Sequence, residues 1–420
     1  MKKINLLKIS ASLFILSLIF HQISYLEVLK NVSIRTSEIT FIFLSIIFLI
    51  NFINKKIDIM FSKFDLYLFF FPVLGFIHVF IFQDYSSVIS VIFFIYCFLI
   101  YFIFKIFFLN FGIEWINKIL ILSALVASII AIFGWILIQF RVDNILVLTY
   151  DYPIFLGEPG RSRALFETPN SLFIFLIFPI FLLIDELKNT KKLKNLIIFL
   201  ILLFGAFVTF SKSNVLLLSL ILILVSNLDN FKKFKILLVT ISGFFIFIYI
   251  FFSHFILLNK NSEKFETYTT TAFVSKNFEI LFDYKDIVLI PTNYIETKKK
   301  SLELFKKNPI FGNGFYSYQK YKSENVPHET GKPHSTYFGY LSEFGLIGLI
   351  LIIFVFAYSA FINWKKNLKK YYLFLFSIYI IFESLNADLM TSRIIWIFFA
   401  YTEFTSINNQ NEAKKLYTFR

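Results

Sequence analysis

Cysteine and charge are both scarce in this sequence. Cys97 is the only cysteine among the 420 residues and lies in an apolar run, which excludes disulfides within the chain and cysteine-based metal sites. Charged residues make up 16% of the chain, against about 25% in a soluble globular protein. The sequence also lacks a Walker motif, an HExxH motif, a His/Cys cluster and an Asp-x-Asp pair in the connections predicted to be external. We therefore expect no ATP hydrolysis, no metal and no cofactor.

Long apolar runs are what the sequence has instead. Hydrophobic residues make up 58% of it, and the runs approach the 20 or so residues that cross a hydrocarbon core. No small-residue cleavage site follows the first run, which indicates a retained helix rather than a signal peptide. We predict an all-α polytopic membrane protein with about 12 transmembrane helices. The expected spans are 5–24, 39–53, 65–82, 88–109, 118–140, 171–186, 195–210, 214–227, 236–258, 336–362, 371–386 and 393–406.

The lysines indicate how these helices are oriented. Every second connection carries a lysine cluster, whereas the alternate short connections hold a single lysine between them. The positive-inside rule then places both termini in the cytoplasm, with an even number of helices. Ten helices remain the alternative if the pair at 195–227 is re-entrant. Because the net charge of +14 lies largely in these connections, the lipid bilayer is an expected partner and nucleic acid is not. The clusters lie at 55–63, 188–194, 232–235 and 365–370.

Two connections on the predicted external side are long. One covers 141–170, and the other covers 259–335, between helices 9 and 10. We therefore divide the chain into transmembrane helices 1–9 (1–258), a large extracytoplasmic loop (259–335), and helices 10–12 with a cytoplasmic tail (336–420). Connections of such length are usually functional, so we expect an active site on the outer face. A helix is expected from Thr297 to Lys307.

The first long connection ends in a pattern typical of anion binding. Arg161 and Arg163 shortly precede Pro169 and Asn170, where a helix is predicted to begin. Guanidinium groups bind phosphate oxygens in a bidentate manner, and the free amides of a helix N-terminus add to this. The alternative is that both arginines contact lipid headgroups.

The second long connection offers glycines and a histidine. Gly312 and Gly314 permit a tight turn or a close backbone approach, but no strand–helix unit surrounds them as a nucleotide site requires. His334 lies where the chain re-enters the membrane and could accept or donate a proton. The alternative is an interfacial polar anchor.

Other ionisable residues lie within or near the predicted spans. Such groups are costly in a membrane and are candidates for function, although those near helix ends can reach water cheaply. Structural explanations are favoured for His78 and Lys105. The candidates are Lys212, Glu343, Glu383, Asp388 and Arg393.

Three stretches resemble the superfamily of O-antigen ligases and O-antigen or exopolysaccharide polymerases, which are integral-membrane glycosyltransferases. The resemblance spans about residues 140–405. The stretches are Arg163-Ala-Leu-Phe166-Glu-Thr-Pro169-Asn170; Thr209-Phe-Ser211-Lys212-Ser213; and Pro309-Ile-Phe-Gly312-Asn-Gly314, followed by Pro333-His334-Ser335 and Glu343-Phe-Gly345-Leu-Ile-Gly348.

The resemblance implies glycosyl transfer at the outer face of the bacterial inner membrane. The expected partner is an oligosaccharide on undecaprenyl diphosphate, with a chain-length regulator as a further candidate. Arg161, Arg163 and Lys212 would bind the diphosphate, and His334 would activate or orient the acceptor hydroxyl. Further candidates, for substrate binding or for structure, are Asn170, Gly312, Gly314, Glu343 and Arg393.

Two departures from the family bear on its activity. Ligases carry arginine where this chain has Lys212, and another arginine at the position of Tyr294, where Lys298, Lys299 and Lys300 are close by. Lysine keeps the charge without the planar fork, which favours a polymerase over a ligase. A transporter of lipid-linked oligosaccharides is the alternative from another class, although no repeat relates the two halves of the chain. A scaffold without catalysis is the remaining alternative.

Overall fold

A helix lies at each of the twelve positions that the sequence predicted. The computed structural model describes residues 6–20, 24–29, 32–83, 85–148, 160–190, 192–226, 235–261, 281–291, 293–315, 317–318, 333–366 and 371–418. Some of the predicted lysine positions, including Lys191, Lys232 and Lys369, lie outside these residues. The twelve helices are α1 (Leu6–Ser17), α2 (Thr36–Ile53), α3 (Lys63–Phe82), α4 (Tyr85–Phe111), α5 (Glu114–Gln139), α6 (Pro169–Thr190), α7 (Leu193–Phe207), α8 (Ser213–Ser226), α9 (Lys235–His254), α13 (Thr336–Lys366), α14 (Tyr371–Glu383) and α15 (Arg393–Thr418).

The described helices identify a membrane protein. Six of them, α2 to α6 and α13, are long and apolar enough to cross a membrane. Five shorter apolar helices accompany them, so a count of twelve spans stays a prediction. On α2, Ile42, Ile46, Leu49 and Ile53 are all more than half exposed, and their spacing places them along one helix face. Such an apolar stripe would be a liability in water, but it is the expected face toward lipid.

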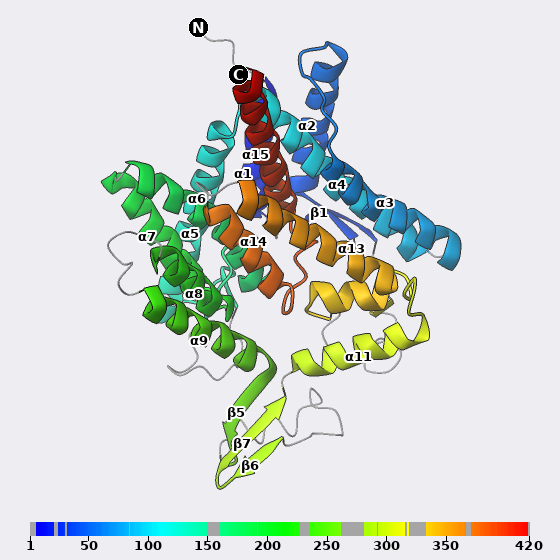
Figure 1. Cartoon of the computed structure of the whole chain (residues 1–420). Helices are drawn as coiled ribbons and strands as arrows, with labels where there is room; N and C mark the ends of the chain where they lie inside the picture. The colour runs from blue at the N-terminus through cyan, green and yellow to red at the C-terminus, as the bar shows by residue number, and fades with distance from the viewer. Residues whose placement is uncertain are drawn as a thin grey trace.

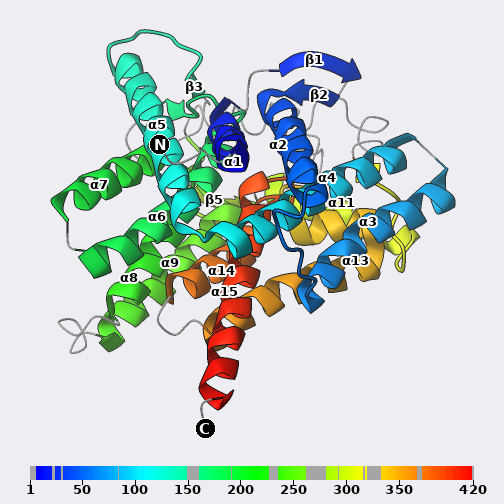
Figure 2. The same ribbon diagram turned by 90° about the horizontal axis from the view of Figure 1, so that it is seen from above.

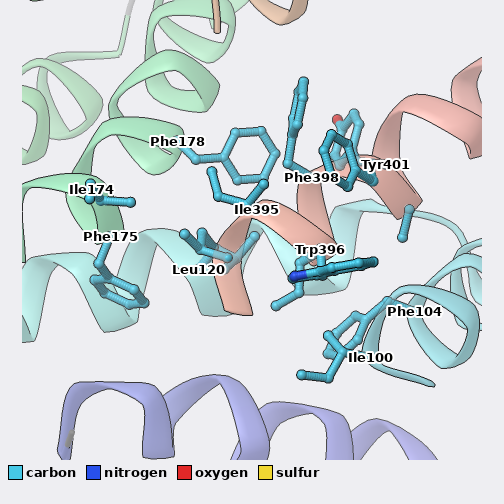
Figure 3. Packing of buried hydrophobic residues seen from close by; sticks show 14 of the residues in the cluster. Ile100, Phe104, Leu120, Ile174, Phe175, Phe178, Ile395, Trp396, Phe398 and Tyr401 are labelled. Atoms are coloured by element: carbon cyan, nitrogen blue, oxygen red, sulfur yellow. The ribbon is translucent and has the colours of Figure 1, made fainter. Parts of the chain in front are cut away.

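Aromatic side chains fill the centre of the helix bundle. Figure 3 shows the rings of Phe178, from α6, and Phe398 and Tyr401, from α15, turned toward one another. The Phe178 ring lies 5.5 Å from that of Phe398 and 5.7 Å from that of Tyr401, both edge-on, the geometry that aromatic quadrupoles favour. Trp396 is fully buried, and its indole nitrogen donates a hydrogen bond to the Met390 carbonyl at 2.9 Å. Aromatic packing therefore accounts for much of the buried centre of the bundle.

A buried ion pair joins α3 to α4. Lys105 donates to Asp65 at 2.5 Å and to the Met60 carbonyl at 2.6 Å, and Tyr101 donates to the other carboxylate oxygen of Asp65. Asp65 also forms a capping box with Ser62 at the start of α3. Lys105 thus has the structural role that the sequence favoured.

Small antiparallel sheets depart from the all-helical prediction. The paired strands are β1 (Ser24–Leu29) with β2 (Val32–Arg35), β3 (Val147–Leu148) with β4 (Arg161–Ser162), and β5 (Phe255–Asn259) with β7 (Ile287–Pro291) and β6 (Phe282–Tyr284), in the order β5–β7–β6.

The predicted ends of two helices are therefore wrong. The helix expected over 5–24 ends in a short 3-10 turn, η1 (Leu18–Phe20), and the one expected over 236–258 ends at His254. Apolar β5 pairs instead with the β-branched run of β7, and one face of this pair is buried at Leu258, Val288 and Ile290. Hydropathy alone cannot distinguish such a strand from the end of an apolar helix.

The large connection supplies a further helix, α11 (Asn293–Lys307), close to the predicted bounds of Thr297 to Lys307. It packs mainly against α13 and also contacts α9. In Figure 1, α11 and the β5–β7–β6 sheet lie at one end of the molecule, and α15 leads to the C-terminus at the other end. Figure 2 gives the view turned by 90°, in which α11 and α13 again lie next to each other. The described part of the large connection therefore lies at one end of the molecule.

Candidate functional site

Arg161 is held in a fixed orientation. Its neighbour Ser162 is buried and is anchored by an amide hydrogen bond to the Val208 carbonyl at 2.9 Å and by a hydroxyl bond to the Ala131 carbonyl at 2.8 Å. The Arg161 guanidinium then donates from Nε to the Thr209 carbonyl and from a terminal nitrogen to Oδ1 of Asn170, both at 3.0 Å. Asn170, in the first turn of α6, therefore orients the arginine that precedes it in the chain.

Lys212 lies beside Arg161 in the short connection between α7 and α8. Its side chain is accessible to solvent, yet the protein atoms around the ammonium group lower its pKa to about 8, with a further contribution from the charge of Arg161. The ammonium lies 5.6 Å from the ring centre of Tyr294, a cation–π distance. The two cations thus come from connections far apart in the sequence.

Tyr294, in the first turn of α11, lies between Lys212 and His334. The rings of Tyr294 and His334 are 5.4 Å apart and edge-on, at an interplanar angle of 64°. His334 has a left-handed backbone, with φ of 46°, which a non-glycine residue adopts only where its surroundings hold it. Those surroundings are contacts on either side: Thr297 donates to the Pro333 carbonyl at 3.2 Å, and the Ser335 hydroxyl donates to Ser384 at 2.9 Å. The chain thereby presents a half-buried imidazole at this point.

Lys298 is a buried cation of the same site. Its side chain is only 8% exposed, and burial lowers its pKa to about 8. The ammonium contacts Nε2 of His254, reaches Oδ1 of Asn386 at 3.4 Å and lies 5.7 Å from the ring centre of Phe338. Sequence reasoning noted three neighbouring lysines without choosing among them. The available signal was position, because Lys298 follows Tyr294 by four residues and so shares its helix face.

Glu383 is hydrogen-bonded to residues that neighbour these cations. Its two carboxylate oxygens accept hydrogen bonds from Ser213, at 2.7 Å, and from Tyr249, at 2.8 Å. Ser213 directly follows Lys212, and the amide of Asn386 donates to the Glu383 carbonyl at 2.8 Å. The carboxylate therefore ties the start of α8 and the middle of α9 to the end of α14.

Two of the predicted arginines make other contacts. Arg163 donates to the carbonyls of Ile145, at 2.9 Å, and Glu167, at 3.4 Å, within its own connection. Arg393 forms an ion pair with Glu38 at 2.5 Å and lies 5.8 Å from the Tyr96 ring centre. The contacts of Arg393 join α15 to α2 and α4. The contacts among Lys212, Tyr294 and His334 involve other elements of the fold.

The glycine motifs form a backbone crossing between the large connection and α13. The amides of Asn313 and Gly314 donate to the carbonyls of Ser342 and Glu343 at 3.1 and 3.0 Å. In return, the amides of Leu346 and Ile347 donate to Pro309 and Ile310 at 2.8 and 3.4 Å. Gly312 and Gly345 both have positive φ and meet at the centre of the crossing. Gly312, Gly314 and Glu343 thus have structural contacts here.

The fold and this site define a helical membrane protein with a cluster of basic side chains beside its apolar helices. Residues 197–353 match the family model described as O-antigen ligase. The match confirms the resemblance to the superfamily of O-antigen ligases and polymerases and supports a membrane glycosyltransferase of that kind. The matched segment contains Lys212, Lys298 and His334, whereas Arg161 precedes it. Comparison with curated proteins gives no match.

Proposed function

We propose that this protein polymerises lipid-linked polysaccharide repeat units of O-antigen or exopolysaccharide. It would transfer a glycan from undecaprenyl diphosphate to an acceptor sugar hydroxyl at the outer face of the bacterial inner membrane. The observation that carries the proposal is that Lys212 and His334 both lie against the Tyr294 ring. Arg161 is close enough to Lys212 to affect it electrostatically, and Lys298 and Lys212 both act on His254. Such a set supplies both positive charge and a proton acceptor.

The reaction needs both of these functions. The acceptor oxygen forms a bond to the anomeric carbon, while the bond from that carbon to the diphosphate oxygen breaks and its electron pair leaves with the diphosphate. The proton of the acceptor hydroxyl goes to an imidazole nitrogen of His334. Negative charge grows on the departing diphosphate, and cations already in place stabilise it without reorganisation.

Each cation has a distinct part in this scheme. Arg161, fixed by Asn170 and the Thr209 carbonyl, presents a planar guanidinium that suits phosphate oxygens. Lys212 and Lys298 act as point charges on flexible stems. Arg163 follows Arg161 by two residues and donates to carbonyls of the same connection. It would bind the outer part of the diphosphate or its sugar. Because side chains supply the positive charge, transfer should proceed without a divalent cation.

The orientation of the protein follows from its lysines. The clusters at 55–63 and 188–194 favour cytoplasmic connections there. This orientation would put both termini in the cytoplasm and α11 outside. The separation of α11 from the end of α15 in Figure 1 supports it.

Ligase activity, with lipid A-core as the acceptor, is the second candidate because the matched family model is described as O-antigen ligase. The polymerase is preferred because this chain has Tyr294 and Lys212 at positions where ligases carry arginine.

Purified protein should be incubated with synthetic undecaprenyl-diphosphate-linked repeat units in the presence of EDTA. His334→Ala is the test variant. Gly243→Ala is the matched control, because no atom lies within 4 Å of the position of its new methyl group. A product ladder from wild type and the control, but not from His334→Ala, supports the polymerase. Products only after addition of lipid A-core support the ligase, and no transfer by folded protein with either acceptor contradicts glycosyl transfer and favours the transporter.

A further inference from the structure

A second histidine, His254, lies at the site without a part in the chemistry described above. It is the last residue of α9 and half buried, and its Nδ1 lies 2.7 Å from the Ile250 carbonyl. A carbonyl oxygen can only accept a hydrogen bond, so Nδ1 must carry the proton. In the neutral ring Nε2 is then an acceptor, and this is the atom that contacts the ammonium of Lys298. The Ile250 carbonyl of α9 thus determines the tautomer of His254, in which the unprotonated Nε2 is directed to Lys298 of α11.

The electrostatics agree with this neutral form. Lys298 and Lys212 are both cations that act on His254, and they disfavour a positive charge on its ring. An imidazolium would place a donor against the Lys298 ammonium, which offers donors only.

We propose that His254 is a positioning residue that holds the ammonium of Lys298 in the site. Its Nε2 fixes the position of the Lys298 ammonium group. Asn386 and the Phe338 ring contact the same ammonium group. The inference rests on the proposed function, in which Lys298 is one of the cations that stabilise the departing diphosphate. Without the acceptor at Nε2, the lysine stem is free to choose other rotamers and its charge is less well placed when the bond breaks.

His254 makes two contacts, one from Nδ1 to the Ile250 carbonyl and one from Nε2 to the Lys298 ammonium. Two amide substitutions distinguish between them. His254→Gln can present an acceptor oxygen near the place of Nε2. His254→Asn has a shorter side chain that can serve only the carbonyl four residues earlier. The chain already contains this second arrangement, since Asn51 and Asn110 donate to the carbonyls of Ile47 and Ile106 at 2.8 and 2.9 Å. The pair is therefore matched in chemistry and differs in reach to Lys298.

Transfer from the lipid-linked donor should be measured for wild type, both variants, Lys298→Ala, and Lys298→Ala combined with His254→Asn. We expect His254→Gln to retain kcat/KM within a few-fold. His254→Asn should lose about 10- to 100-fold, the value of a hydrogen bond to a charged group. In the Lys298→Ala background, His254→Asn should have little further effect, because it acts through that lysine.

The outcomes separate this inference from the proposed function. Inactive wild type would refute the proposed function and the inference together. Active wild type with an equally active His254→Asn variant would overturn the inference alone. The inference would also be overturned if His254→Asn lowered kcat/KM by the same factor in the Lys298→Ala background as in wild type. Melting temperatures of all variants show whether any loss reflects unfolding.

Discussion

Alanine at Gly312 should disrupt the backbone crossing that joins the large connection to α13. Gly312 has φ of +72°, and a Cβ there would lie 2.5 Å from the Gly345 nitrogen and closer still to the Glu343 carbonyl. The left-handed backbone costs an L-residue about 1–2 kcal/mol. Separating the two segments would also weaken four hydrogen bonds, each contributing about 1 kcal/mol. We therefore expect a loss of about 3–6 kcal/mol, depending on how far the crossing opens.

Thermal unfolding in detergent, followed by intrinsic fluorescence, measures this loss. Gly312→Ala should melt roughly 5–10 °C below wild type, whereas Gly243→Ala, whose methyl group would meet nothing within 4 Å, should melt with wild type. Because α11 and His334 flank the crossing in the chain, transfer activity should fall as well. Equal melting temperatures for Gly312→Ala and Gly243→Ala would refute the packing argument.

Three further predictions follow from the charged groups. Arg161→Lys keeps the charge but loses the fork that its two bonds hold in place, so KM for the lipid-linked donor should rise about tenfold; unchanged donor titrations would contradict this. The pKa of Lys212 and that of Lys298 are both about 8, so both ammonium groups are charged below pH 8 and lose their protons above it. KM for the lipid-linked donor should therefore rise between about pH 8 and 9. A KM that stays constant over this range would exclude a role for the two lysines in donor binding. Lys105→Ala leaves Asp65 buried without its cation and should cost about 3–5 kcal/mol, seen as a lower melting temperature, while Lys55→Ala, at an exposed position, serves as its control.

Local pattern was sufficient to predict most of the helices. Runs of apolar residues near membrane length predict helices because the backbone must satisfy its own hydrogen bonds in lipid, and all twelve predicted positions are helical. Their ends were less predictable. The Phe255–Asn259 run is as apolar as the end of α9, and it becomes a strand only because β7 is available to pair with it. That partner lies about 30 residues further along the chain, beyond the reach of any local pattern.

The sequence by itself determined the kinds of side chain available for the candidate site: basic residues at 161 and 212, a histidine at 334, and glycines at 312 and 314. Only the tertiary structure decided which of these come together. It joined Arg161 to Asn170 and Lys212 to Tyr294, and it directed Arg393 to Glu38 instead. It also selected Lys298 among three adjacent lysines, because helix periodicity and the position of His254 turn that one inward. The physical reason is that a charge becomes part of a site through its distance from other charges and its burial, and both depend on how segments far apart in the sequence pack.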